Sequence, residues 1–143
     1  MLTISITTCQ FTNIHEESTT YLKRYFQEVR SGKLNDNQLV FIMQPSSCSA
    51  CSNEATAFIN EVFSRHNGVK TFILNGIEKS AFLELQFSQL PNSIVILDSM
   101  KQIDRYGFTH VSDVVIEVKE QRIVRIETIV KDNFRKIKRR YKN

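Results

Sequence analysis

An uninterrupted apolar run, Leu39 to Met43, constrains the fold of this chain more than any other feature. Consecutive apolar residues of this kind are typical of a strand that is buried on both faces, and such strands occur in the middle of parallel sheets. After a short polar connection, apolar residues recur at helical spacing from Ala55 to Phe63, and Asn67-Gly68 ends the pattern. A buried strand followed by an amphipathic helix predicts an α/β fold.

The rest of the chain continues the alternation of strands and helices. Apolar residues recur at helical spacing between His15 and Arg30, which predicts a helix. Ser18 or Thr19 is expected to cap its start, and Ser31-Gly32 to end it. Further strands are expected at 69–74, 93–97, 114–118 and 122–130, and further helices at 78–89, 100–106 and 131–143. We therefore expect a central mixed sheet with a parallel centre and an antiparallel C-terminal hairpin, flanked by helices.

One domain accounts for this order of elements. The chain has 143 residues, of which 41% are hydrophobic, and a chain of this length buries about two thirds of its unfolded surface in one core. We assign residues 18–143 to the domain and residues 1–17 to an N-terminal segment. The composition excludes collagen-like and wholly disordered chains, and no apolar run approaches the ~20 residues of a membrane-spanning helix.

Positive charge is concentrated at the C-terminus. Residues 131–143 contain seven basic residues and one acidic residue, whereas residues 1–130 contain twelve basic and fourteen acidic residues. Phe134, Ile137 and Tyr141 recur at helical spacing, so we interpret this tail as a docked helix whose lysines and arginines face water. A patch that binds phosphates or a membrane surface is the alternative, and we expect no nucleic-acid partner.

The N-terminal residues 1–8 alternate apolar and small hydroxylated side chains and stop at Cys9. The basic start of a complete secretory signal is missing, but the pattern resembles the end of a bacterial lipoprotein signal, in which such a cysteine becomes lipidated. With a translation start upstream, Cys9 would tether a periplasm-facing lipoprotein to the cell envelope. Without one, the protein would be cytoplasmic. An ordinary cysteine in a strand-like N-terminus is an equally open alternative.

Two further cysteines, Cys48 and Cys51, lie between the buried strand and the amphipathic helix. This position puts both sulfurs at or just before a helix N-terminus, where free amide hydrogens and the helix dipole stabilise a thiolate. The two-residue spacer lets the second sulfur close a small disulfide ring. We therefore expect Cys48, on the exposed side, to act as the nucleophile and Cys51 to resolve the mixed disulfide.

The spacing of Cys48 and Cys51 also fits two roles without redox chemistry. Half of a zinc site has the same spacing, but zinc needs two further cysteine or histidine ligands, and His15, His66 and His110 are scattered singly. Two inert cysteines on a helix are the second such role, because small thiols are commonly buried. We expect neither a metal nor a cofactor.

Taken in order, these pieces resemble the thioredoxin-like superfamily, and within it the bacterial envelope thiol-disulfide proteins related to TlpA and the peroxiredoxins. The resemblance covers about Leu39 to Val130, with the Cys48 and Cys51 pair at the position of the family's active site. The segment from Ile94 to Phe108 is similar to that branch's next strand and short helix, and 114–130 to its last hairpin. The resemblance implies a thioredoxin-like fold with a redox-active centre that forms a disulfide bond.

The sequence departs from this family opposite the cysteine pair. Most members have a cis-proline there, which shapes the substrate groove, whereas this chain has Ser112 after Val111. A cis bond before serine would cost about 3 kcal/mol, so a trans peptide and an altered groove are expected. Pro91, at a shorter spacing, is a second candidate for that position. Because Ser47 replaces the usual tryptophan and the spacer differs, the redox direction does not carry over.

Two carboxylates are candidates to accept the proton of the resolving thiol. Glu54 lies three residues after Cys51, and Asp113 lies beside the groove position. His110 is a further candidate base in the same loop. We expect a thiol-disulfide oxidoreductase that acts on protein dithiols or disulfides. The alternative, favoured by the missing proline, is a catalytically weak thioredoxin-fold binding or chaperone-like module in the bacterial cell envelope.

Overall fold

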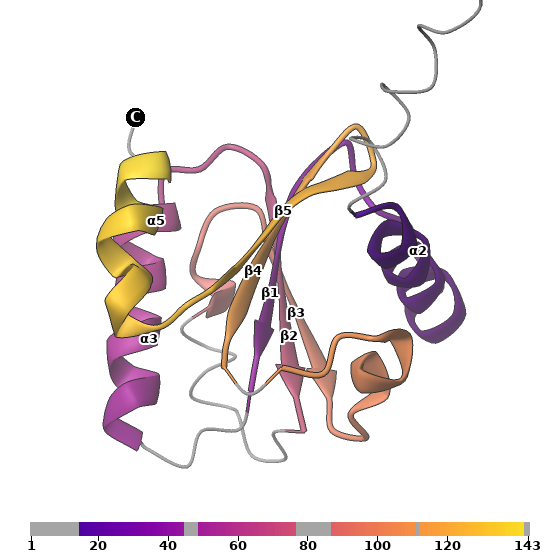
Figure 1. Cartoon of the computed structure of the whole chain (residues 1–143), viewed down its shortest axis with the longest axis horizontal. Coiled ribbons are helices and arrows are strands. Elements are labelled where there is room, and N and C mark those ends of the chain that lie inside the picture. The colour runs from indigo at the N-terminus through magenta and orange to yellow at the C-terminus, as the bar shows by residue number, and fades with distance from the viewer. Residues whose placement is uncertain (1–14, 45–48, 77–86, 111, 142–143) are drawn as a thin grey trace, which may run out of the picture.

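The computed structural model of this chain describes residues 15–44, 49–76, 87–110 and 112–141, except for the side chains of residues 49–53. The described strands form one five-stranded sheet in the order β3-β2-β1-β4-β5 (Figure 1). The middle strand β1 pairs in parallel with β2 and antiparallel with β4. The strands are β1 (Asn37–Met43), β2 (Val69–Asn75), β3 (Ser93–Asp98), β4 (Val114–Lys119) and β5 (Arg122–Thr128).

Helices cover both faces of the sheet. Figure 1 shows α2 and the short helix η1 on one side of the strands, and α3 and α5 side by side on the other. This arrangement is a three-layer α/β fold, in which each face of the central sheet is shielded from water. The helices are α2 (Glu16–Arg30), α3 (Ser49–Phe63), η1 (Gln102–Tyr106), η2 (Lys131–Asn133) and α5 (Phe134–Tyr141).

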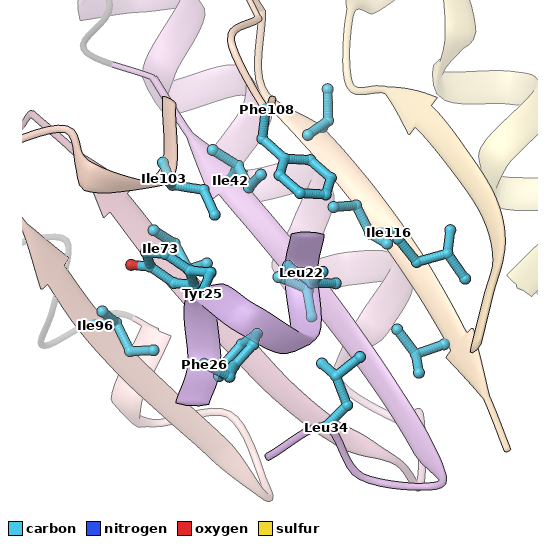
Figure 2. Close-up of a cluster of buried hydrophobic side chains, with 14 residues drawn as sticks. Leu22, Tyr25, Phe26, Leu34, Ile42, Ile73, Ile96, Ile103, Phe108 and Ile116 are labelled. Atoms are coloured by element: carbon cyan, nitrogen blue, oxygen red, sulfur yellow. The ribbon is translucent and has the colours of Figure 1, made fainter. Parts of the chain in front are cut away.

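The first hydrophobic core lies between the sheet and α2 (Figure 2). Every second residue of a strand points its side chain to this face of the sheet, and Ile42 and Ile73 are among these residues. Leu22, Tyr25 and Phe26 of α2 are buried against them. Tyr25 is completely buried, and its ring meets the ring of Phe26 edge-on at 5.6 Å between centroids. These contacts fix α2 across the sheet.

The second core lies on the opposite face, beneath α3 and α5. Phe72 is stacked between Phe41 and Phe87, with ring centroids 4.7 and 4.2 Å away. Phe58 of α3 stacks on Phe134 of α5 at 4.1 Å, which joins the two helices of this layer. Residues that alternate along β1 therefore supply both cores, as the apolar run in the sequence predicts.

The expectation of an α/β fold with a mixed sheet and a C-terminal hairpin is confirmed, although its details differ. The parallel strands form one half of the sheet, with β1 at the boundary to the antiparallel half, instead of occupying the centre. The helix expected at 100–106 is a 3-10 helix that starts at Gln102. The helix expected at 78–89 falls largely outside the described residues.

The expected cap of the first helix was wrong. The helix begins after His15, and its N-terminus has no side-chain cap. The Thr19 hydroxyl instead donates to the His15 carbonyl at 2.6 Å and accepts the Ile123 amide hydrogen at 3.0 Å. Because this hydroxyl bonds across to the sheet, it ties α2 to β5 and is not a capping group. The end of the helix at Ser31 is as expected.

The structure has no membrane-spanning helix among its described segments. None of the helices there is both long and apolar enough to cross a bilayer.

Candidate functional site

The register of β1 against β4 defines one edge of the sheet. Ile42 lies opposite Val114, so Ser112 and Asp113, which precede β4, fall beside Met43 and Gln44 at the end of β1. The parallel strands β2 and β3 also finish at this edge. In α/β sheets, ligands bind outside the carboxyl ends of the parallel strands, where the chain leaves the sheet in different directions.

Asp113 joins β1 to β4 at this edge. Its carboxylate Oδ1 accepts a hydrogen bond of 2.6 Å from the backbone N–H of Gln44, and its own carbonyl accepts the N–H of Ile129 at 2.7 Å. Burial raises the pKa of Asp113 from 3.8 to about 6, against the opposing effect of the Gln44 hydrogen bond. A carboxyl group with such a pKa exchanges its proton close to neutral pH, which suits a proton acceptor or donor.

Two amide side chains extend this network across the ends of β1 and β2. Asn75, which is 1% exposed, donates through Nδ2 to Gln44 Oε1 at 3.0 Å and to Asp104 Oδ1 at 2.9 Å. The set of Gln44, Asn75, Asp104 and Asp113 is called the polar cluster below. In the described part of the chain, Gln44 Nε2 and Asn75 Oδ1 have no hydrogen-bond partner. Buried polar atoms are normally paired, so these two atoms are notable as a free donor and a free acceptor.

Asp98 ends the third parallel strand and has a structural role. Its Oδ1 accepts the N–H of Gln102 at 2.9 Å, and its Oδ2 accepts the N–H of Ile103 at 2.8 Å, so it caps the start of η1. The hydroxyl of Tyr25 also donates to Oδ2, at 3.1 Å. Burial raises the pKa of Tyr25 to about 12, so this hydroxyl keeps its proton. These bonds fix η1, which carries Asp104 into the polar cluster.

The predicted cysteine pair falls, in the sequence, between the end of β1 and the first turn of α3. Cys51 is the third residue of α3, which starts at Ser49, and its side chain lies outside the described residues. Cys48 directly precedes the helix in sequence and lies outside the described residues, as do Cys9 and Val111. The expectation that the second cysteine lies in the first turn of a helix is therefore confirmed, whereas the position of its sulfur stays a prediction.

The remaining predicted residues separate into two groups. Ser112 is half-buried and directly precedes Asp113, so the groove position and one candidate proton acceptor lie together at the edge. Glu54 is exposed on α3 and forms no hydrogen bond or ion pair with the described part of the chain. His110 is half-buried in the loop before β4 and has no hydrogen-bond partner among the described residues. Of the two candidate carboxylates, Asp113 therefore lies at the edge of the sheet beside Ser112, whereas Glu54 is exposed on α3.

His66 lies at the opposite edge of the sheet, after the end of α3. Its Nδ1 accepts the N–H of Gly68 at 3.1 Å, and burial lowers its pKa, so it is neutral at physiological pH. Beside it, the buried ammonium of Lys70 donates to the carbonyls of His66 at 2.6 Å and Pro91 at 2.9 Å. A cation at the carbonyl end of a helix is favourable, and these groups stabilise the fold away from the polar cluster.

Metal binding finds no support in the part of the chain that the structure describes. No group of three or more His, Cys, Asp or Glu side chains lies close enough there to hold an ion. Asp104 and Asp113 each accept a hydrogen bond from an amide or backbone nitrogen through one carboxylate oxygen, and Asp98 accepts backbone N–H groups through both.

Sequence reasoning missed Gln44, Asn75 and Asp104. Gln44 directly follows β1 and Asn75 is the last residue of β2, and no functional role was predicted for either. A usable signal existed, because polar residues that follow parallel strands meet at one edge of the sheet. The contribution of Asp104 depends on the orientation of η1, which no local pattern indicates.

Comparison with known proteins adds no relative. No protein-family model matches the chain, and no curated protein matches it.

Proposed function

We propose that the protein is a thioredoxin-like thiol-disulfide oxidoreductase that acts on protein dithiols or disulfides through Cys48 and Cys51. The observation that carries this proposal is the pairing of β1 with β4, in which Ile42 lies opposite Val114. This register brings Ser112 and Asp113 to the edge from which the Cys48 segment leaves β1. The resemblance to the thioredoxin-like superfamily requires the groove position and the cysteine pair to share one edge.

The order of the elements supports the same assignment. A strand leads through the cysteine pair into α3, a parallel neighbour follows, and an antiparallel hairpin and a C-terminal helix complete the domain. The strand and short helix inserted before the hairpin, β3 and η1, occupy the places at which this chain resembles the TlpA-related branch. This order of elements supports the proposed thioredoxin-like assignment.

The reaction exchanges one disulfide for another. In the direction that reduces a substrate disulfide, the Cys48 thiolate attacks one of its sulfurs, which releases one substrate thiolate and leaves a mixed disulfide; the reverse steps oxidise a substrate dithiol. Cys51 loses its proton, attacks the Cys48 sulfur and releases the second substrate thiolate. The substrate gains two electrons, and the protein retains a Cys48–Cys51 disulfide that an external dithiol must reduce.

Asp113 is the proposed proton acceptor for Cys51. Its carboxylate is held at residue 44, four positions before Cys48, and its pKa of about 6 leaves it mainly ionised at neutral pH. Side chains along a strand point alternately to the two faces of the sheet. If this alternation continues to the residue before β4, the side chain of Asp113 lies on the same face as that of Val115, which faces α3. A base on that face is well placed to serve the first turn of α3.

Trapping of the mixed disulfide tests this function. In a Cys9→Ser background, the protein would be incubated with a disulfide-bonded peptide, and mixed disulfides would be measured by mass spectrometry. We expect Cys51→Ser to accumulate a mixed disulfide on Cys48 and Cys48→Ser to form none. A stable peptide complex without covalent exchange in any variant would contradict the proposal and support the binding-module alternative.

A further inference from the structure

The outward face of α5 is a second functional candidate, independent of the cysteine chemistry. Its other face packs against the protein: Ile137 is completely buried, and the rings of Phe134 and Tyr141 contact Phe58 and Phe63 of α3. Because successive helix residues are about 100° apart, the positions opposite these three are 135, 136 and 139. Arg135, Lys136 and Arg139 therefore form an outward row, called the basic ridge below.

Two acidic residues near α5 pair with cations beside the ridge. Lys138 on one flank bonds Glu61 of α3 at 2.6 Å, and Arg140 on the other flank pairs with Glu127, next to β5's end. No acidic side chain reaches the ridge itself, since its three residues are exposed and form no ion pair or hydrogen bond with the described part of the chain. The fold thus holds three uncompensated cations on one rigid helix face.

This unpaired charge is a local feature and does not reflect a generally basic protein. Residues 1–130 contain more acidic than basic residues, and Asp132 is the single acidic residue of the tail. Figure 1 shows α5 on the outer side of the domain, in the same layer as α3. The ridge is therefore exposed on the outside of the domain.

We propose that the basic ridge docks the domain onto an anionic phospholipid surface. A layer of phosphate headgroups complements this exposed row of cations in charge, and basic residues on an amphipathic helix are attracted to such layers. Nucleic acid fits the ridge less well: the aromatic rings of α5 point inward, so none is free to stack on bases.

Binding of vesicles by the full chain tests this proposal. Sedimentation would compare vesicles of phosphatidylcholine alone with vesicles that also contain phosphatidylglycerol, under reducing conditions. We expect binding only to the anionic vesicles, and weaker binding as salt screens the charges. Each basic residue near a membrane surface contributes about fivefold in affinity, so the triple variant Arg135→Gln/Lys136→Gln/Arg139→Gln should lose on the order of a hundredfold.

A matched control separates the ridge from net charge. The triple variant Lys23→Gln/Lys33→Gln/Arg122→Gln also removes three exposed cations, but from α2, the segment after it and β5. We expect this control to bind nearly as well as the unchanged protein. Equal losses in the two triple variants, or equal binding to neutral and anionic vesicles, would overturn the proposal. Preferential binding of an oligonucleotide that displaces the vesicles would also overturn it.

Discussion

The carboxylate of Asp113 accepts the backbone N–H of Gln44 at 2.6 Å, and this bond links the start of β4 to the end of β1. It places an ionisable group with a pKa near 6 at the edge of the sheet where β1 ends. Asp113 thereby makes the stability of the fold depend on pH. In the proposed reaction, the same residue also accepts a proton. The two roles are separately testable.

The stability of the protein should decrease as the pH rises from about 4 to about 6. Because burial raises the folded-state pKa of Asp113 from 3.8 to about 6, the folded state holds this proton more tightly than the unfolded state. The contribution of this proton to the free energy of unfolding is fully present below the pKa that Asp113 has in the unfolded state. It is lost as the pH rises past the pKa that Asp113 has in the folded state. It amounts to about 3 kcal/mol, and urea unfolding across this pH range measures it.

Asp113→Asn is the control for that measurement. The variant cannot ionise, so it should remove this component of the pH dependence while the other groups titrate as before. An unchanged pH profile in Asp113→Asn would show that another group is responsible.

The rate of mixed-disulfide resolution should discriminate between the two candidate proton acceptors. With the proton acceptor removed, Asp113→Asn should slow the attack of Cys51 by about a hundredfold, the lower end of the contribution of a positioned acid or base. Glu54→Gln should have little effect, because the exposed Glu54 side chain forms no hydrogen bond or ion pair with the described residues. Single-turnover release of a thiol reporter measures both rates, and a selective loss in Glu54→Gln would reverse the assignment.

The polar cluster illustrates what the sequence can and cannot predict. The run Leu39 to Met43 predicts β1, because a strand buried on both faces is apolar at every position. The bond between Gln44 and Asp113 depends instead on the pairing of residues 69 positions apart, which neither local pattern contains. The buried Lys70 was equally hidden, because its partners are carbonyls at the ends of other elements.

Removal of Glu117 should loosen the attachment of α5. Its carboxylate, on β4, accepts the Tyr141 hydroxyl at 2.9 Å and pairs with Arg125 at 3.2 Å. Glu117→Ala leaves these two groups without their acceptor and should lower the free energy of unfolding by about 1–3 kcal/mol. Glu54→Ala, an exposed acid on α3, should change it by about 0.5 kcal/mol or less. Equal unfolding midpoints in the two variants would refute this role of Glu117.

The stacked rings around Phe72 should dominate the stability of the second core. Phe72→Ala removes the ring between Phe41 and Phe87 and should cost about 3–5 kcal/mol, because the surrounding rings cannot fill the space. Ile94→Ala in β3, where the side chain is 51% exposed, should cost about 1 kcal/mol or less. Denaturant unfolding of the pair measures the contrast, and a loss below about 1 kcal/mol in Phe72→Ala would show that the core repacks.

The most direct test of the central claim is an equilibrium redox titration of Cys48 and Cys51. The titration would use Cys9→Ser protein in a series of glutathione or dithiothreitol buffers, with free thiols counted by alkylation and mass. We predict a reversible two-electron transition that Cys48→Ser abolishes. A pair that never oxidises, or that once oxidised resists reduction across the whole series, would contradict the account and leave a binding domain in place of an oxidoreductase.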